Sequence, residues 1–174
     1  MKSQTALLAA LVFSLAFLAA CQGKRPSPSA SASCDIGGGK TIKTAYSSPR
    51  MNGRKIYGAL VPFGQVWRTG ANEATTFVIS GDMIMGGKSI PAGSYTIFTV
   101  PTADNWTLII NKKTGEWGIP YKYEGDELAR IGMNMAKLPS PVENFSISYD
   151  KSATGCTMNI LWETTRAFVD IKAK

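Results

Sequence analysis

The chain has 174 residues, a formal net charge of +7 and no histidine, and its length suits one globular domain. Without histidine, Ser-His-Asp and Cys-His catalysis are excluded, as is every metal site that uses an imidazole. The three cysteines are too few for a four-cysteine zinc site. We therefore expect neither a metal nor a cofactor.

Residues 1–20 predict an export signal. Lys2 supplies a positive start, and residues 6–20 are apolar except for Ser14. This run is shorter than the roughly 20 apolar residues of a membrane-spanning helix and suits a secretory signal peptide. It ends in the sequence LAAC at Cys21, which resembles the lipobox of bacterial lipoproteins. The resemblance implies cleavage before Cys21 and acylation of this cysteine; the alternative is an ordinary signal peptide with an incidental cysteine.

The residues after Cys21 indicate where the protein is anchored. Gln22, rather than aspartate, follows the cysteine, which resembles the pattern of outer-membrane lipoproteins that face the periplasm of Gram-negative bacteria. Residues 22–33 are rich in proline, serine and alanine and contain no large apolar side chain, so they predict a flexible tether. We expect a signal peptide at 1–20, a lipidated cysteine and tether at 21–33, and a folded domain at 34–174. The membrane is then a partner, and we expect no nucleic acid to bind because no recognisable binding motif is present.

Within 34–174 the dominant pattern is alternation of apolar residues with period two. It is clearest at 94–100 and 106–111, and it recurs at 41–46, at 75–80 and in three segments after residue 144. Gly, Pro and Asn-Gly turn residues separate these runs. The pattern predicts a mainly β fold, a single antiparallel β-sandwich or jelly-roll-like domain. The residues expected to face inward are Phe77, Ile79, Tyr95, Ile97, Leu108, Ile110 and Trp162.

A segment that begins at Leu128 fits two periodicities. It makes a helical stripe of Leu128, Ile131, Met135 and Leu138. It also alternates as a strand does, with Ala129, Ile131, Met133 and Met135 on one side. Gly132 and Asn134 disfavour the interior of a helix. We therefore predict a strand.

Two cysteines remain if Cys21 is acylated. Because export favours disulfide formation, we expect Cys34 and Cys156 to be bonded; the alternative is two unpaired thiols. Such a bond would close a long loop, and the chain-entropy argument gives about 5 kcal/mol as an upper estimate of its stabilisation.

The segment between Asp35 and Glu73 carries basic side chains and no acidic one. A segment of this kind attracts an anion or an anionic surface. The alternative is a solvated face that the acidic residues at 124–127 balance.

The stretch VWRTGANEA at 66–74 places an aromatic, a cation, an amide and a carboxylate around a glycine. We expect a buried tryptophan to anchor a polar turn that forms one wall of a functional cleft, because binding groups are commonly mounted on loops of a rigid scaffold. The alternative is a structural ion pair of Arg68 with Glu73 or Glu163. The candidate binding residues are Arg54, Trp67, Arg68, Asn72 and Glu73.

A second hypothesis for function uses carboxylates. Glu73, Glu116 and Glu163 each lie next to or near a tryptophan, and paired carboxylates hydrolyse glycosidic bonds. The tryptophans would then stack on sugar rings. The alternative is that all of them serve packing.

Several stretches together are similar to a bacterial family catalogued as domain of unknown function 2911. They are GRKIYG (53–58), LVPFG (60–64), VWRTGANEA (66–74), GKSIPAGSYT (87–96), WTLIIN (106–111), WG (117–118) and WETTR (162–166). The resemblance covers about residues 34–172 and implies one exported domain without implying a mechanism. We therefore carry two hypotheses forward: a non-catalytic binding or interaction module of an envelope lipoprotein, and a small carboxylate-based hydrolase acting, for example, on glycans.

Overall fold

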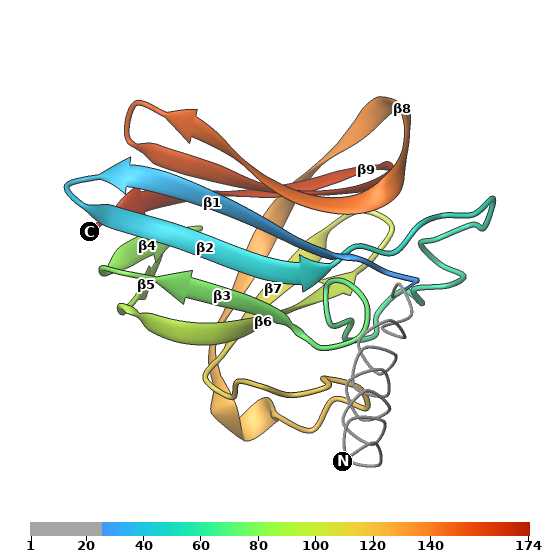
Figure 1. Ribbon diagram of the computed structural model, residues 1–174, viewed down its shortest axis with the longest axis horizontal. Coiled ribbons are helices and arrows are strands. Elements are labelled where there is room, and N and C mark those ends of the chain that lie inside the picture. The colour runs from blue at the N-terminus through green and yellow to red at the C-terminus, as the bar shows by residue number, and fades with distance from the viewer. Residues whose placement is uncertain (1–25) are drawn as a thin grey trace, which may run out of the picture.

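The computed structural model describes residues 26–174 (Figure 1). The predicted signal peptide and Cys21 lie outside these residues. Within them the chain forms nine strands and one short 3-10 helix, η1 (Glu124–Asp126). The strands are β1 (Ser29–Gly37), β2 (Lys40–Ser47), β3 (Thr75–Ile79), β4 (Met83–Met85), β5 (Lys88–Ile90), β6 (Gly93–Pro101), β7 (Trp106–Asn111), β8 (Glu127–Ser152) and β9 (Gly155–Ala173). No helix in the described range has the length and apolar character needed to cross a membrane.

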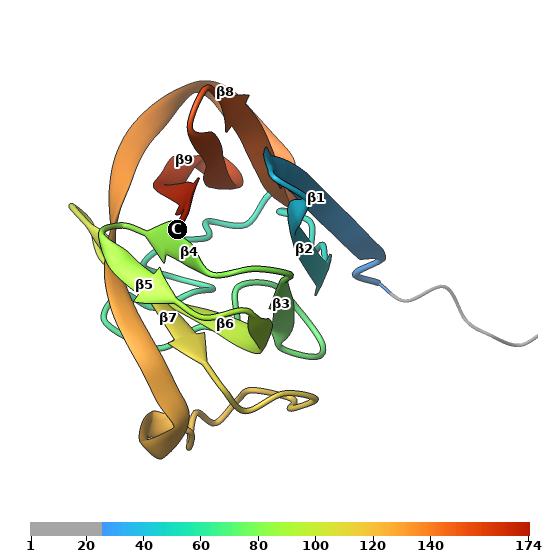
Figure 2. The same ribbon diagram turned by 90° about the vertical axis from the view of Figure 1, so that its left-hand side faces the viewer.

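The strands form a single antiparallel sheet in the order β1-β2-β3-β6-β7-β8-β9-β4-β5. The sheet coils, so that β1 at one edge packs against β8 and β9 although other strands separate them in the order. Figure 2 shows these two parts of the sheet facing each other. The prediction of a mainly β, antiparallel domain is confirmed, and the two facing layers expected of a sandwich belong here to one continuous sheet.

The ribbon of β8 and β9 contributes to this coiling because it bends back on itself. β8 pairs with β7 up to Met133 and with β9 from Asn134 onward. Its ladder with β9 shifts register within residues 137–146, an interval that contains two prolines, which cannot donate ladder hydrogen bonds. On the opposite strand Glu163 has a left-handed φ of 53°. Both strands therefore turn at the same place.

The bend brings the beginning of β9 close to its own end. The hydroxyl of Thr157 donates a hydrogen bond to the Asp170 carboxylate at 2.7 Å. Trp162 stands next to the bend and is buried. The fold thus carries this tryptophan to the end of the domain where the loop after β2 lies.

The core fills the space between the facing parts of the sheet. The seven side chains predicted to face inward are all buried, with exposed fractions of 7% or less, so this prediction is confirmed. The segment that fitted two periodicities, 128–138, belongs to β8 and is a strand, as predicted.

One predicted boundary is wrong. Strand β1 begins at Ser29, not at Cys34, and its residues 29–33 pair with β2, with Ser29 opposite Ser47 and Ser33 opposite Lys43. Residues 29–33 are therefore part of the sheet rather than of the tether. Their composition did not indicate a strand, because backbone hydrogen bonds hold this edge strand in the sheet. Small serine and alanine side chains allow such pairing but leave no hydrophobic alternation in the sequence.

A disulfide joins Cys34 in β1 to Cys156 in β9, with their Cα atoms 6.7 Å apart. This separation lies within the range that a disulfide spans. The bond connects the edge strand to a strand that faces it across the core, so it closes the coil of the sheet covalently.

Candidate functional site

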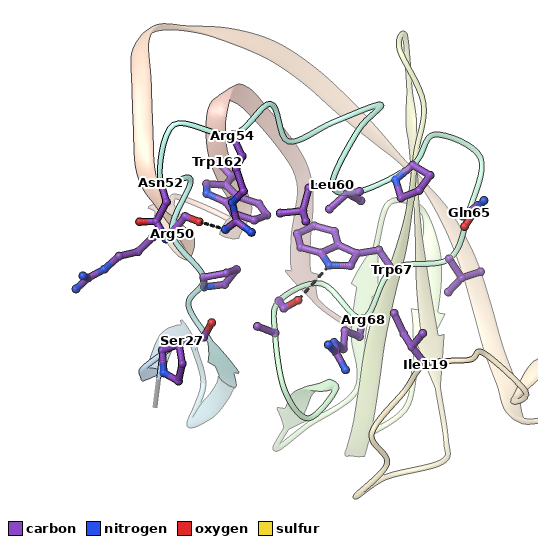
Figure 3. A pocket seen from close by; sticks show the side chains of 17 residues that line it. Ser27, Arg50, Asn52, Arg54, Leu60, Gln65, Trp67, Arg68, Ile119 and Trp162 are labelled. Atoms are coloured by element: carbon purple, nitrogen blue, oxygen red, sulfur yellow. Dashed lines mark hydrogen bonds between the residues drawn. The ribbon is translucent and has the colours of Figure 1, made fainter. Parts of the chain in front are cut away.

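A cleft of about 600 Å³ lies beside the loop that joins β2 to β3 (Figure 3). Residues between 49 and 71 form most of its wall, and Pro26, Ser27, Ile119 and Trp162 complete it. The volume is typical of small-molecule sites, which span roughly 300–1,000 Å³. Segments that are distant in the sequence therefore meet in one concave surface.

The floor of the cleft contains two tryptophans. Trp67 and Trp162 stack with ring centroids 5.9 Å apart and an angle of 17° between the rings. Tyr57, Trp106 and Phe145 pack edge-on around Trp67 at centroid distances of 5.2 to 6.4 Å. Aromatic pairs in these geometries stabilise beyond their buried area. The floor is consequently apolar and well supported.

Hydrogen bonds of both its backbone and its indole ring position Trp67. Its backbone N–H donates to the Thr99 carbonyl at 2.8 Å and its carbonyl accepts from Thr99 N–H at 2.9 Å, which attaches the loop to β6. Its indole N–H donates to the Gly70 carbonyl at 3.0 Å. A Cβ at position 70 would lie only 3.0 Å from the Ser47 carbonyl oxygen, so glycine allows the turn to approach β2 closely.

Asn72 completes this turn but does not line the cleft. It adopts a left-handed φ of 57°, which asparagine tolerates better than most residues. Its amide donates to the Ser47 hydroxyl at 3.1 Å and to the Ser27 carbonyl at 3.3 Å. Asn72 therefore ties the segment entering β1 to the turn, which is a positioning role.

Of the described residues that line the cleft, three are arginines and none is acidic. The guanidinium of Arg54 donates to the backbone carbonyls of Met51 at 2.9 Å and Arg50 at 2.6 Å, and Arg50 itself is exposed. These bonds hold Arg54 at the rim and leave part of its donor set for a ligand, because a guanidinium has five N–H donors.

Arg68 lines the cleft from the Trp67 turn. Its guanidinium lies 5.0 Å from the centre of the Trp117 ring and donates to the Trp117 carbonyl at 3.4 Å. Burial lowers the pKa of Arg68, and the charge of Glu73 acts in the opposite direction. The side chain remains a cation, and its partial burial strengthens its attraction for an anion.

The structure separates the predicted binding residues. Arg54, Trp67 and Arg68 line the cleft, whereas Asn72 and Glu73 do not. Glu73 is exposed and Arg68 is partly exposed, so they do not form a buried pair.

Other lining residues were missed from the sequence: Arg50, Leu60, Ile119, Trp162 and the Pro26–Ser27 segment. The sequence did offer a signal for two of them, because Arg50 belongs to the basic segment and Leu60 to an apolar loop. From the sequence, Trp162 is expected to face inward or, with the other tryptophans, to stack on a sugar. Nothing local places it beside Trp67, because it reaches the cleft only through the bend of the β8–β9 ribbon.

The candidate catalytic carboxylates do not line the cleft. Glu116 pairs with Lys113 at 3.9 Å and accepts a hydrogen bond from the Tyr123 hydroxyl at 3.3 Å. Glu163 stands at the bend of β9. Burial raises the pKa of the Tyr57 hydroxyl, and the charge of Glu163 adds to this effect.

The fold and this site can be set beside known proteins. The sequence profile of a family described as "Protein of unknown function (DUF2911)" matches residues 27–171. Comparison with curated proteins and with solved structures found no match. The matched range includes the whole cleft apart from Pro26. The chain therefore belongs to the family of proteins of unknown function DUF2911.

Proposed function

We propose that this protein is a lipid-anchored component of the bacterial envelope, facing the periplasm from the outer membrane, and that its domain is a non-catalytic binding module. Its ligand is an anion with an apolar or aromatic part. The observation that carries this proposal is the composition of the cleft, in which a tryptophan floor is combined with arginines and with no acidic side chain among the described lining residues. The LAAC sequence at Cys21 supports the proposed anchor.

The chemistry of such a ligand follows from the two parts of the wall. Trp67 and Trp162 stack on each other and are 8% and 1% exposed, so they close the floor of the cleft with an apolar surface of small area. Leu60, Val61 and Ile119 add apolar wall against which a ring or an alkyl chain can lie.

Arg54 and Arg68 offer planar donor groups that bind a carboxylate, sulfonate or phosphate in a fork geometry. An inorganic anion would contact only the arginines and leave the apolar floor unused. An uncharged sugar would provide no negative charge for the arginines to bind.

The hydrolase hypothesis has less support. Glycoside hydrolysis requires two carboxyl groups on either side of the scissile bond, roughly 5 to 9.5 Å apart. Glu73, Glu116 and Glu163 do not line the cleft. The arrangement therefore favours binding over hydrolysis.

Anilinonaphthalene sulfonate tests the binding proposal because it combines an aromatic body with one negative charge. We expect residues 26–174, which contain every described element, to bind this probe with enhanced fluorescence. Removing one charge-assisted hydrogen bond in Arg68→Ala should weaken binding about tenfold, which corresponds to about 1.4 kcal/mol. The matched control is Lys151→Ala. Lys151 is an exposed cation in the β8–β9 hairpin, where it lies opposite Cys156 in the strand register. Equal affinities in the wild type and both variants would refute the proposal.

Urea melts separate this role of Arg68 from a structural clasp with Glu73. We expect Arg68→Ala and Glu73→Ala each to change the free energy of unfolding by about 1 kcal/mol or less. A clasp predicts losses of about 3–5 kcal/mol in each single variant, with recovery in the double variant. That result would show that the turn carrying Arg68 and Glu73 stabilises the fold and is not a binding site.

The anchor has its own test. Cys21→Ala should leave unprocessed precursor without fatty-acid label, because acylation requires the thiol. Unchanged labelling of the mature protein in this variant would show that the lipoprotein assignment is wrong.

A further inference from the structure

Apolar side chains are exposed mainly around the cleft. Among the described residues, five large hydrophobic side chains are exposed, and four of them belong to two loops at the cleft. Leu60 and Phe63 lie in the loop after β2, and Trp117 and Ile119 lie in the loop after β7. Their exposed fractions are 44 to 56%. We call these four residues the apolar rim.

The apolar rim is one surface rather than two separate tips. Leu60 and Ile119 line the same cleft, and Figure 3 shows them on opposite sides of Trp67. Trp117 stacks against Arg68, which also lines the cleft. Leu60, Ile119 and Trp117 therefore lie beside a mouth that carries positive charge, and Phe63 belongs to the same loop as Leu60.

The path of the chain places this surface near the proposed anchor. Pro26 lines the cleft, and five residue steps separate it from Cys21. An extended chain spans at most about 3.6 Å per residue, so the Cα atoms of Cys21 and Pro26 lie within about 18 Å of each other. An acylated Cys21 is at the bilayer surface, and the rim is then within reach of the same surface.

We propose that the apolar rim docks on the anionic phospholipid bilayer that holds the lipid anchor. This inference rests on the proposed anchor and goes beyond the binding proposal. Trp117, Phe63, Leu60 and Ile119 enter the boundary between headgroups and acyl chains, where tryptophan and other apolar side chains of peripheral proteins reside. Arg50, Arg54 and Arg68 face the lipid phosphates, because basic residues beside a membrane are attracted to anionic lipids.

Docking would narrow the class of ligand. The mouth of the cleft would open at the headgroups instead of toward the aqueous periplasm. A ligand would then enter from the bilayer, which selects amphiphiles that carry a phosphate or carboxylate beside an apolar chain. The anionic group would remain near the arginines while the apolar part lies on the tryptophan floor.

Quenching of tryptophan fluorescence by brominated lipids tests the docking directly. Trp117 is 56% exposed, whereas Trp67, Trp106 and Trp162 are buried at 8% or less, so quenching reports mainly on Trp117. The mature, acylated chain would be reconstituted into vesicles of brominated phosphatidylcholine, with and without phosphatidylglycerol. We expect strong quenching that increases with phosphatidylglycerol and that Trp117→Phe removes.

Matched variants distinguish docking from mere proximity. Leu60→Ser with Phe63→Ser should at least halve the quenching, because insertion of the rim is lost. Val78→Ser should leave it unchanged, since Val78 is the remaining exposed large hydrophobic residue of the described chain and lies on β3. Absence of quenching in the wild type, or the same quenching in the rim variant, would overturn the inference. So would a cross-linked dimer in which the rim is covered by a second copy and shielded from the lipid.

Failure of docking is distinguishable from failure of the proposed function. Binding of anilinonaphthalene sulfonate is measured on residues 26–174 without any lipid. Arg68-dependent binding together with absent quenching would discard docking and retain the binding module. Quenching without probe binding would retain docking and discard the ligand site.

Discussion

The two ends of this domain are built differently. At one end, on the left of Figure 1, the β1–β2 and β8–β9 hairpins turn in two residues each, and the chain terminus is held by a hydrogen bond from the Lys40 ammonium group to the Lys174 carbonyl at 2.8 Å. The Cys34–Cys156 disulfide joins the strands of these two hairpins. At the other end, long loops carry the arginines and the apolar rim. We call these the hairpin end and the cleft end.

The difference indicates which end serves stability and which serves binding. Stability at the hairpin end comes from backbone ladders and a covalent bond. The cleft end leaves Trp117 and Ile119 exposed to water, which folding alone would not favour because burying apolar surface is the main stabilising contribution. Exposed apolar side chains beside arginines, in a cleft without an acidic side chain among its described lining residues, are therefore more consistent with an interaction surface than with a structural one.

The largest effect is expected from removing the disulfide. Cys34→Ala with Cys156→Ala opens a link of sequence separation 122, and chain entropy predicts a loss of about 5 kcal/mol in the free energy of unfolding. Guanidinium denaturation measures this loss. Binding of the fluorescent probe under native conditions should persist, because the cross-link is at the hairpin end. Loss of probe binding in a variant that remains folded would show that the two ends are coupled.

A clash at the hairpin end should be next in size. A Cβ at Gly155 would overlap the carbonyl oxygen of Ile171, so Gly155→Ala should cost about 2–3 kcal/mol, the upper part of the usual range for overpacking. Gly132→Ala is the control, since its Cβ would meet nothing within 4 Å. Urea melts of the two variants make the comparison. Equal stabilities would mean that the contact between the two halves of β9 relaxes without cost.

A smaller effect is expected at the cleft end from Asn72→Ala. The variant loses the hydrogen bonds to Ser47 and Ser27 and places alanine at a left-handed φ of 57°, so we expect a loss of about 1–2 kcal/mol. Asn72→Gly removes the same hydrogen bonds without the backbone strain and should be less destabilised in the same urea assay. If the alanine and glycine variants are equally stable, the strain contribution is absent.

The smallest effect concerns the base of the loop that carries Trp117 and Ile119. Glu127 accepts hydrogen bonds from Arg130 at 2.7 and 2.8 Å and from the Tyr121 hydroxyl at 2.7 Å. The hydrogen bonds from Arg130 lower the pKa of Glu127 below its ordinary value of 4.5, although burial opposes this change. Because the folded-state pKa is lowered, the stabilisation is fully present above pH 4.5 and is lost as the pH falls through the folded-state pKa.

Urea melts of the wild type and Glu127→Gln, from neutral pH to about pH 3, measure this contribution. We expect the wild type to lose up to about 1 kcal/mol more than the variant over this interval, since the Arg130 side chain is half exposed and solvent screens the pair. Parallel pH dependence in the two proteins would show that Glu127 does not stabilise the loop through its charge.

Much of the fold was predictable because alternation along a strand reports directly which side chains face the core. The strands at 94–100 and 106–111 and the inward side chains Phe77 and Trp162 follow from this pattern. The edge strand at 29–33 could not be predicted in this way, because its serine and alanine residues show no alternation and its pairing depends on β2.

The candidate site was predictable only where it is local. Trp67 and Arg68 are neighbours in one turn, so a short stretch was sufficient to place both at a cleft. Asn72 and Glu73 belong to the same stretch, yet the backbone turns at Gly70 and the asparagine side chain is directed to Ser47 and Ser27.

The sequence alone therefore determined the β class, the inward faces of the strands and the aromatic anchor of the turn, because each depends on residues close together in the chain. Only the tertiary structure decided the shape and charge of the cleft. Trp162 reaches it through the bend of the β8–β9 ribbon, Ile119 through the loop after β7, and Pro26 through the start of the edge strand. The physical reason is that these contacts depend on how strands pair and bend over long separations, which local residue patterns do not encode.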